Sequence, residues 1–284
     1  LAIRIHLIAA ARPNFVKIAP IWRAVSTTPG SFLPTLVHTG QHYDHNMSDV
    51  FFSDLGLPRP QHNLGVGSGS HARQTAGVMV RYEELLEHER PDCVLVVGDV
   101  NATVAAALTA TKLLIPVVHV EAGLRSGDRT MPEEINRMVT DRISDLLLTP
   151  SRDGDRNLIH EGIPEDQIVR VGNVMIDSLV HAVARVQDRR TYTRFDLEAG
   201  SYGLVTLHRP ANVDEPEKLK RLLTSLRDLA QPMVFPVHPR TRNVIDQHAE
   251  LGRLLEGSGL TITDPLGYDD FLSLMISARF VITD

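Results

Sequence analysis

The sequence predicts an α/β protein built around two parallel sheets. Short apolar runs alternate along the chain with segments whose apolar residues recur at helical spacing, and this alternation is typical of βαβ units. The stretch 94–125 shows the pattern most clearly, because apolar runs at 94–97 and 116–120 flank a helix-like segment. Asp99 and Glu121 come just after these two runs. Ligands of open parallel sheets bind beyond the carboxyl ends of the strands, so we expect both carboxylates to face one pocket.

The first half of the chain contains one complete strand–helix series. A helix is expected to begin at Pro13, because the missing N–H of proline costs nothing at a first helical position, and another near Pro132. Strands are expected at 3–10, 32–37, 94–97, 116–120, 145–149 and 168–171, and further helices at 44–55, 72–89, 151–161 and 175–190. A charged stretch follows the last helix up to about 201. This change in composition predicts two domains, residues 1–174 and 175–284.

The second half repeats the rhythm. Strands are expected at 203–207, 233–237, 260–263 and 279–283. Asp214 is expected to cap a helix that has Pro216 early and a buried leucine stripe. The last strand runs up to Asp284 with no helix after it. Because parallel sheets need cover on both faces, we expect the second domain to be C-terminally truncated.

Bulk composition narrows the function classes. The net charge is −6 and the pI is about 6.1, which argues against a nucleic-acid partner because such proteins carry a basic face. The single cysteine, Cys93, excludes an internal disulfide and indicates a reducing, cytoplasmic location. Its place at the start of an apolar strand favours an inert buried thiol. No apolar run reaches the length of a membrane span, so no membrane partner is expected.

Cations and carboxylates gather at the predicted strand ends. Arg12 and Lys17 flank the first turn of the first helix, where backbone N–H groups favour an anion; the alternative is a solvated pair at a helix end. Asp99 could instead serve only as a helix N-cap, whereas Glu121 has no such simple alternative. Glu133 could belong to a capping box that begins at Thr130, or pair with the residue four positions later.

Three carboxylates near one pocket suggest proton transfer, because crowding moves some of their pKa values toward working pH. His208, Arg209 and His238 follow strands of the second half, and with Arg12 and Lys17 they would provide the positive field for a diphosphate.

Other motifs are weaker. His38, His42 and His45 lack a cysteine or carboxylate at ligand spacing, so no metal is expected. The glycines at 65, 67 and 69 lack a preceding strand, and no P-loop or serine nucleophile elbow is present.

Together these residues carry a resemblance. The chain resembles the non-hydrolysing UDP-N-acetylglucosamine 2-epimerases over essentially its whole length, because a set of short segments occurs in the same order and spacing. They are Ala11-Arg-Pro-Asn-Phe-Val-Lys17, Thr39-Gly-Gln-His42, Arg73-Gln-Thr75, Gly98-Asp99, His119-Val-Glu-Ala-Gly-Leu-Arg125, Pro132-Glu-Glu-Ile-Asn-Arg137, Gly172-Asn173, Thr206-Leu-His-Arg209 and Pro236-Val-His-Pro239.

The resemblance implies two Rossmann-like domains facing a cleft, as in the B-type glycosyltransferase fold, and a homodimer. It implies interconversion of UDP-N-acetylglucosamine and UDP-N-acetylmannosamine. The C2 proton is removed and UDP is expelled, which leaves a 2-acetamidoglucal; UDP then adds back while C2 is reprotonated from the other face. No cofactor or metal is implied.

The resemblance also assigns residues to roles. It implies a catalytic set (Asp99, Glu121, Glu133 and His208) and a substrate-binding set (Arg12, Lys17, Arg125, Arg137, Asn173, Arg209 and His238). Gln41 and Arg73, with His208, Arg209 and His238, match parts of an activating second-substrate site. This chain departs from that pattern after Arg209, where the run Pro-Ala-Asn212 has no glutamate.

The family pattern continues beyond Asp284 with nucleotide-holding residues, so residues 1–284 alone are expected to bind UDP-sugars weakly and to show little activity. The alternatives are a UDP-sugar glycosyltransferase, a hydrolysing epimerase, and a non-catalytic sugar-nucleotide-binding homologue.

Overall fold

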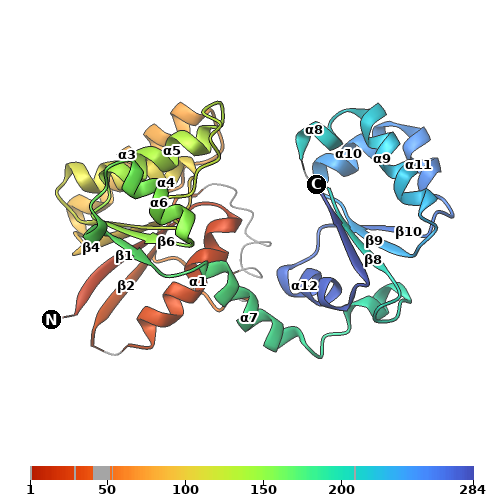
Figure 1. Ribbon diagram of the computed structural model, residues 1–284, viewed down its shortest axis with the longest axis horizontal. Coiled ribbons are helices and arrows are strands. Elements are labelled where there is room, and N and C mark those ends of the chain that lie inside the picture. Colours follow the sequence, from red (N-terminus) through yellow and green to blue (C-terminus); the bar gives the residue numbers. More distant parts are fainter. Residues whose placement is uncertain (1, 29, 41–51, 53, 208) are drawn as a thin grey trace. The chain divides into compact units, whose positions relative to one another are not determined.

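The structure is a computed structural model that describes residues 2–28, 30–40, 52, 54–207 and 209–284. The chain divides into two compact units, Leu1–Val180 and His181–Asp284 (Figure 1). The division falls within the helix α7 (Val174–Val186), whereas the sequence placed the boundary between residues 174 and 175, at the start of that helix. The predicted α/β class with parallel sheets is confirmed.

The described part of unit 1 contains a parallel sheet in the order β3-β2-β1-β4-β5-β6-β7. The strands are β1 (Ile3–Ala9), β2 (Phe32–His38), β3 (His62–Asn63), β4 (Cys93–Val97), β5 (Val117–Val120), β6 (Leu146–Thr149) and β7 (Ile168–Arg170). The central strands are apolar throughout most of their length, with Leu7, Val94 and Val117 fully buried, because helices cover both of their faces.

The helices of unit 1 lie in two layers. They are α1 (Arg12–Ser26), α3 (His71–His88), α4 (Asn101–Lys112), α5 (Pro132–Ile143), α6 (Arg152–His160) and the first part of α7, with a 3₁₀ turn at Glu165–Gln167. Figure 1 shows α3, α4 and α5 on one face of the sheet and α1 with α7 on the other. Alanines at 102, 105, 106, 107 and 110 make α4 a deeply buried helix, because small side chains let it approach the sheet closely.

The strand order reverses between β1 and β4. The chain moves from β1 to β2 in one direction, and from β4 through β5, β6 and β7 in the other. Such a switch point leaves a crevice at the carboxyl ends of the two central strands, where ligands bind in open α/β sheets. The first turn of α1 follows β1, and Asp99 follows β4, so the fold brings both to this crevice.

Unit 2 has a smaller parallel sheet in the order β10-β9-β8-β11. Its strands are β8 (Gly203–Thr206), β9 (Met233–Pro236), β10 (Leu260–Thr263) and β11 (Phe280–Thr283); its helices are α8 (Pro210–Val213), α9 (Pro216–Asp228), α10 (Pro239–Gln247), α11 (Ala249–Leu255) and α12 (Tyr268–Ser277), with a 3₁₀ turn at Thr191–Phe195. The core packs Leu219, Leu223 and Leu226 of α9 against Val205 and Phe235.

Several local predictions are corrected. The N-cap of α9 is Glu215 rather than Asp214, whose carboxylate instead lies 3.3 Å from Arg240 Nε. The connection after residue 55 contains the short strand β3, which the sequence pattern missed because it is only two residues long. The helix predicted at 44–55 falls mostly outside the described residues.

Two further predictions concern chemistry rather than fold. In the part of the chain that the structure describes, no helix is both long and apolar enough to cross a membrane. Cys93 is half-buried, and burial is the main cause that raises the pKa of its thiol, as expected of an unreactive cysteine.

Candidate active site

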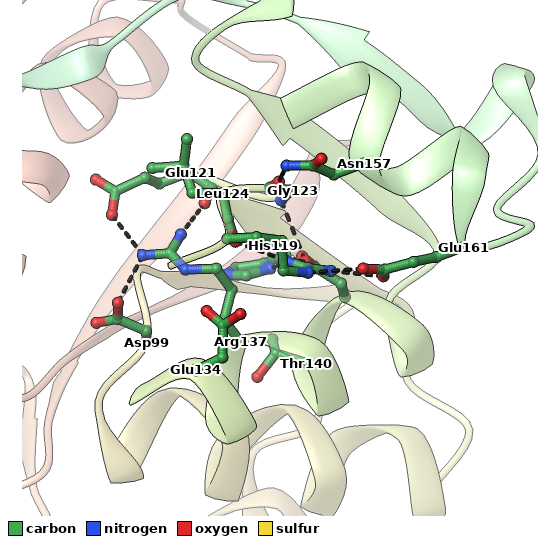
Figure 2. A network of polar contacts seen from close by, with 12 residues as sticks. Asp99, His119, Glu121, Gly123, Leu124, Glu134, Arg137, Thr140, Asn157 and Glu161 are labelled. Carbon is green, nitrogen blue, oxygen red and sulfur yellow. Dashed lines mark hydrogen bonds and ion pairs between the residues drawn. The ribbon is translucent and has the colours of Figure 1, made fainter. Parts of the chain in front are cut away.

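Asp99 and Glu121 share one guanidinium at the switch point. Arg137, on the second turn of α5, places Nη2 2.6 Å from Asp99 Oδ2 and 3.1 Å from Glu121 Oε1. Its Nη1 also donates a hydrogen bond to the main-chain carbonyl of Glu121. Figure 2 shows the guanidinium lying between the two carboxylates. The planar fork of arginine suits such a bridge, because its several N–H groups point in fixed directions.

A second cation, provided by α1, also contacts Glu121. Lys17 Nζ, on α1, lies 2.8 Å from the Glu121 carboxylate, and both side chains are only slightly exposed, at 11% and 13%. Asn14, one turn earlier on α1, donates from Nδ2 to the carbonyl of Val97 at 3.1 Å. The amide therefore ties α1 to the end of β4. Charges consequently alternate across the crevice, from lysine to carboxylate to arginine to carboxylate.

Unusual backbone geometry supports this arrangement. Glu121 has a φ of +69°, a left-handed conformation that costs a non-glycine residue about 1–2 kcal/mol and that is concentrated at functional sites. Gly123, two residues later, has a φ of +79°, and a Cβ there would lie 2.4 Å from the carbonyl oxygen of Gly154. Only glycine fits where the loop after β5 crosses the first turn of α6.

A second polar network lies beneath these groups. His119, on β5, is fully buried and places Nδ1 2.7 Å from Asp141 Oδ1 and Nε2 2.8 Å from the carbonyl oxygen of Gly98. Asp141 also accepts a hydrogen bond from Arg125 Nη1 at 2.7 Å, and Arg125 forms a two-point ion pair with Glu161. Burial acts to raise the pKa of Asp141, but the hydrogen bonds and charges of His119 and Arg125 outweigh it and hold this pKa below its usual range.

Glu134 holds the loop between β5 and α5. The side chain accepts hydrogen bonds from the main-chain N–H groups of Ser126 at 2.9 Å and Gly127 at 3.1 Å. Burial alone would raise the pKa of Glu134, but the two backbone donors lead the contributions that bring it below its ordinary value. Two residues further along the helix, Asn136 Nδ2 donates to the carbonyl of Asp99 at 2.9 Å. Glu134 therefore orders the loop rather than facing an open site.

The sequence prediction missed these supporting residues. Asn14, His119, Glu134, Asn136 and Asp141 are buried or half-buried and polar. Two signals were available. His119 interrupts an apolar strand, and Asp141 follows Arg137 by one helical turn on the same face of α5.

Asp99 is not a helix N-cap and Glu133 is not part of a capping box, which were the structural alternatives considered for these carboxylates. The N-cap of α4 is Val100, and no side chain caps it, so Asp99 is not a helix cap. The N-cap of α5 is Met131, again with no side-chain cap bond, and Thr130 bonds to Asp128 instead. The capping box predicted around Glu133 is therefore absent. Glu133 is exposed in the first turn of α5.

Arg125, Asn173 and Arg73 are not part of the bridge that Arg137 forms between Asp99 and Glu121. Arg125 belongs to the network beneath the site. Asn173 Oδ1 accepts a hydrogen bond from the N–H of Met175 at 3.0 Å, at the start of α7, and Arg73 is exposed in the first turn of α3. Gln41 and His208 lie outside the described residues, as does the side chain of Arg12, the first residue of α1.

In unit 2, Arg209 is exposed, and its N–H donates to Asp284 Oδ2 at 3.1 Å. His238 is the N-cap of α10, where its Nδ1 accepts from the N–H of Arg240 at 3.2 Å. No group of histidine, cysteine and acidic residues that could hold a metal ion occurs within residues 2–28, 30–40, 52, 54–207 and 209–284. Of the histidines considered as metal ligands, His38 stacks on Phe15, and His42 and His45 are outside the described residues.

The geometry of unit 1 is suited to proton transfer near an anion. Two fixed carboxylates at neighbouring strand ends can accept or donate protons, and a lysine and an arginine beside them can stabilise negative charge that develops in a reaction.

Known proteins that are named UDP-sugar 2-epimerases are similar to this chain. The sequence profile of the family described as UDP-N-acetylglucosamine 2-epimerase matches residues 24–284. A Methanocaldococcus jannaschii protein named UDP-N-acetylglucosamine 2-epimerase is 38% identical over 288 residues, which are 99% of this chain and 78% of the relative. A Pseudomonas aeruginosa protein named UDP-2,3-diacetamido-2,3-dideoxy-D-glucuronate 2-epimerase is 39% identical over 286 residues, with the same shares covered.

Solved structures are similar over the same extent. The crystal structure of the M. jannaschii UDP-GlcNAc 2-epimerase in complex with UDP-GlcNAc and UDP has a TM-score of 0.85 and 39% identity, and the match covers 99% of this chain and 78% of that one. The Neisseria meningitidis UDP-GlcNAc 2-epimerase bound to UDP-GlcNAc has a TM-score of 0.87 and 28% identity, with 99% and 77% covered.

Proposed function

The chain belongs to the UDP-N-acetylglucosamine 2-epimerase family, and from this premise we propose that it inverts C2 of a UDP-linked N-acetylated sugar. The observation that carries the proposal is the bridge in which Arg137 holds the carboxylates of Asp99 and Glu121 beside Lys17. Inversion at C2 needs a base on one face of the sugar and an acid on the other, and a pair of carboxylates held at fixed positions can provide both.

The proposed reaction proceeds by elimination and addition. A carboxylate takes the C2 proton, the C–H electrons form a C1–C2 double bond, and the anomeric C–O bond breaks with its electrons leaving on UDP. UDP then adds back to C1 while a proton reaches C2 from the opposite face. Lys17 and Arg137 would stabilise the developing charge, and retention of both fragments keeps the return step intramolecular.

The remaining family assignments are part of the same proposal. Glu133 would act as a further acid or base, and His208 would stabilise or protonate the departing diphosphate. Arg12, Asn173, Arg209 and His238 would bind substrate, and Gln41 and Arg73 would contribute to a second-substrate site. Arg125, whose guanidinium is held by Asp141 and Glu161, would support the substrate-binding groups from the network beneath the site. We also propose a cytoplasmic homodimer, for which light scattering of the purified protein tests the oligomeric state.

The substrate pair that we propose is UDP-N-acetylglucosamine and UDP-N-acetylmannosamine. A second candidate substrate is UDP-2,3-diacetamido-2,3-dideoxy-D-glucuronate, for which the Pseudomonas aeruginosa relative is named. That relative is 39% identical to this chain, and the M. jannaschii epimerase is 38% identical. Both sugars carry an acetamido group at C2 and UDP at C1, so the same acid–base chemistry serves either.

Incubation of each UDP-sugar with the purified protein in D₂O tests the proposal. The expected result is deuterium at C2 of both the recovered sugar nucleotide and its epimer, detected by NMR, with loss of exchange in Asp99→Asn and Glu121→Gln variants whose circular dichroism spectra show that they remain folded. Free UDP in amounts equal to the sugar consumed would favour a hydrolysing epimerase. Transfer of sugar to an acceptor without C2 exchange would favour a glycosyltransferase. Saturable binding of UDP without any reaction would favour a non-catalytic homologue.

A further inference from the structure

In the described part of unit 1, the most deeply buried contact between a basic and an acidic side chain is that of His119 with Asp141, whose side chains are 0% and 1% exposed. Removing two charges from water costs several kcal/mol per ion, and this cost is recovered only when the remaining hydrogen-bonding atoms also have partners. The arrangement around this pair meets that condition. Burial of the pair therefore costs little, and the role of the pair follows from the elements that it connects.

Every polar atom of the pair has a partner. His119 Nε2 lies 2.8 Å from the carbonyl oxygen of Gly98, and Asp141 Oδ2 accepts from the N–H of Gly123 at 3.1 Å and from Arg125 Nη1 at 2.7 Å. A carbonyl oxygen and an ionised carboxylate can only accept hydrogen bonds. Both contacts of the ring are therefore hydrogen bonds only when both ring nitrogens carry hydrogen, which is the imidazolium form.

The contacts of the pair reach three elements, and each element carries one group of the candidate site. Gly98, which accepts from the ring, directly precedes Asp99. Gly123, which donates to the carboxylate, is two residues after Glu121. Asp141 itself lies one turn after Arg137 on α5. The pair thus fastens the turn after β4, the loop after β5 and the helix α5 to a single buried point.

We propose that His119, as a buried imidazolium paired with Asp141, is a positioning residue that fixes Asp99, Glu121 and Arg137 relative to one another. His119 does not touch the reacting groups; it acts through the Gly98 carbonyl and through Asp141. The proposal deepens the epimerase function and rests on it for its kinetic consequence. The arrangement of the three side chains does not depend on turnover.

The test uses a single variant and a compensating double variant. In His119→Gln, the new amide N–H can donate to Gly98, but its other polar atom is an oxygen that faces the Asp141 carboxylate. In the double variant His119→Gln/Asp141→Asn, the amide at position 141 can donate to that oxygen and still accept from Gly123. The double variant restores the hydrogen bonds without the ion pair. His160→Gln, at an exposed position at the end of α6, is the matched control.

We expect His119→Gln to lower kcat about 100-fold, because a displacement of about 1 Å has an effect of this size, while KM changes by no more than about threefold. We expect the double variant to regain at least about tenfold in kcat, and His160→Gln to match the wild type. A His119→Gln variant with wild-type kcat, or a double variant no more active than the single one, would overturn the positioning role.

Two NMR readouts are independent of turnover. In ¹⁵N-histidine-labelled protein, the His119 signals, assigned by their loss in His119→Gln, should show both ring nitrogens protonated; a neutral ring would overturn the imidazolium. The Arg137 side-chain N–H signals should shift in His119→Gln and return in the double variant, and signals unchanged in all variants would overturn the positioning. If the wild-type protein binds UDP-sugar without C2 exchange, the proposed function fails and these two measurements still decide the inference.

Discussion

Gly98→Ala tests whether the position of the Lys17 ammonium matters for activity. Gly98 has a φ of +68°, and a Cβ at this position would lie 3.0 Å from Lys17 Nζ and 3.9 Å from Glu121 Oε1. Because Nζ is the mobile end of a long side chain, it can move away at little cost to stability. It would then leave its place 2.8 Å from the Glu121 carboxylate.

The stability effect is small and the activity effect is larger. Left-handed backbone costs alanine about 1–2 kcal/mol, and loss of glycine entropy in the unfolded chain returns about 0.4–1 kcal/mol. A net loss of about 1 kcal/mol lowers the melting temperature by about 2–4 °C for a unit of this size. The displaced ammonium should lower kcat about tenfold, which corresponds to about 1.4 kcal/mol of transition-state stabilisation.

Gly162→Ala is the matched control for the backbone term. Gly162, just after α6, has a φ of +80°, and a Cβ added there would meet no atom within 4 Å. Calorimetry and C2 deuterium exchange are measured on both variants. The two should lose similar stability, and only Gly98→Ala should lose activity. Equal activity in the two variants would refute the reasoning that the Lys17–Glu121 contact contributes to the reaction.

Three other substitutions probe the bridge, the buried ion pair and the core of unit 2. Arg137→Lys should lower kcat about 100-fold or more at nearly unchanged melting temperature, because a single ammonium cannot bridge Asp99 and Glu121 as a guanidinium does; steady-state kinetics would contradict this if kcat were retained. Asp141→Asn should cost about 3 kcal/mol in urea unfolding at about pH 7. The folded-state pKa of Asp141 lies below the unfolded value of 3.8, so its contribution is present above that value and is lost as pH falls through the folded pKa; the deficit of the variant should therefore shrink in acid, and a deficit independent of pH would contradict the ion pair. Leu219→Ala, in the fully buried core of unit 2, should cost about 2–5 kcal/mol and lower one of two calorimetric transitions, whereas a uniform shift of a single transition would show that the units unfold together.

The sequence determined the fold class and most of the element order by itself. The apolar runs at 94–97 and 116–120 became β4 and β5 with a difference of one residue at one end of each, because strands buried on both faces must be continuously apolar. The carboxylates that follow these strands were predictable candidates for the same reason, since a parallel sheet brings the ends of its strands to one edge. Short elements such as β3 were not predictable, because two residues carry no periodicity.

Only the tertiary structure decided which charges meet. Arg137 had an acidic residue four positions earlier, Glu133, and helical spacing alone favoured that pair, yet the guanidinium turns to Asp99 and Glu121 on two other elements. His119 and Asp141 are 22 residues apart in sequence, and no local pattern pairs them. Periodicity records which face of an element is buried. Which buried charges pair depends on long-range packing. A charge removed from water is stabilised only beside an oppositely charged group, and the fold determines which groups are adjacent.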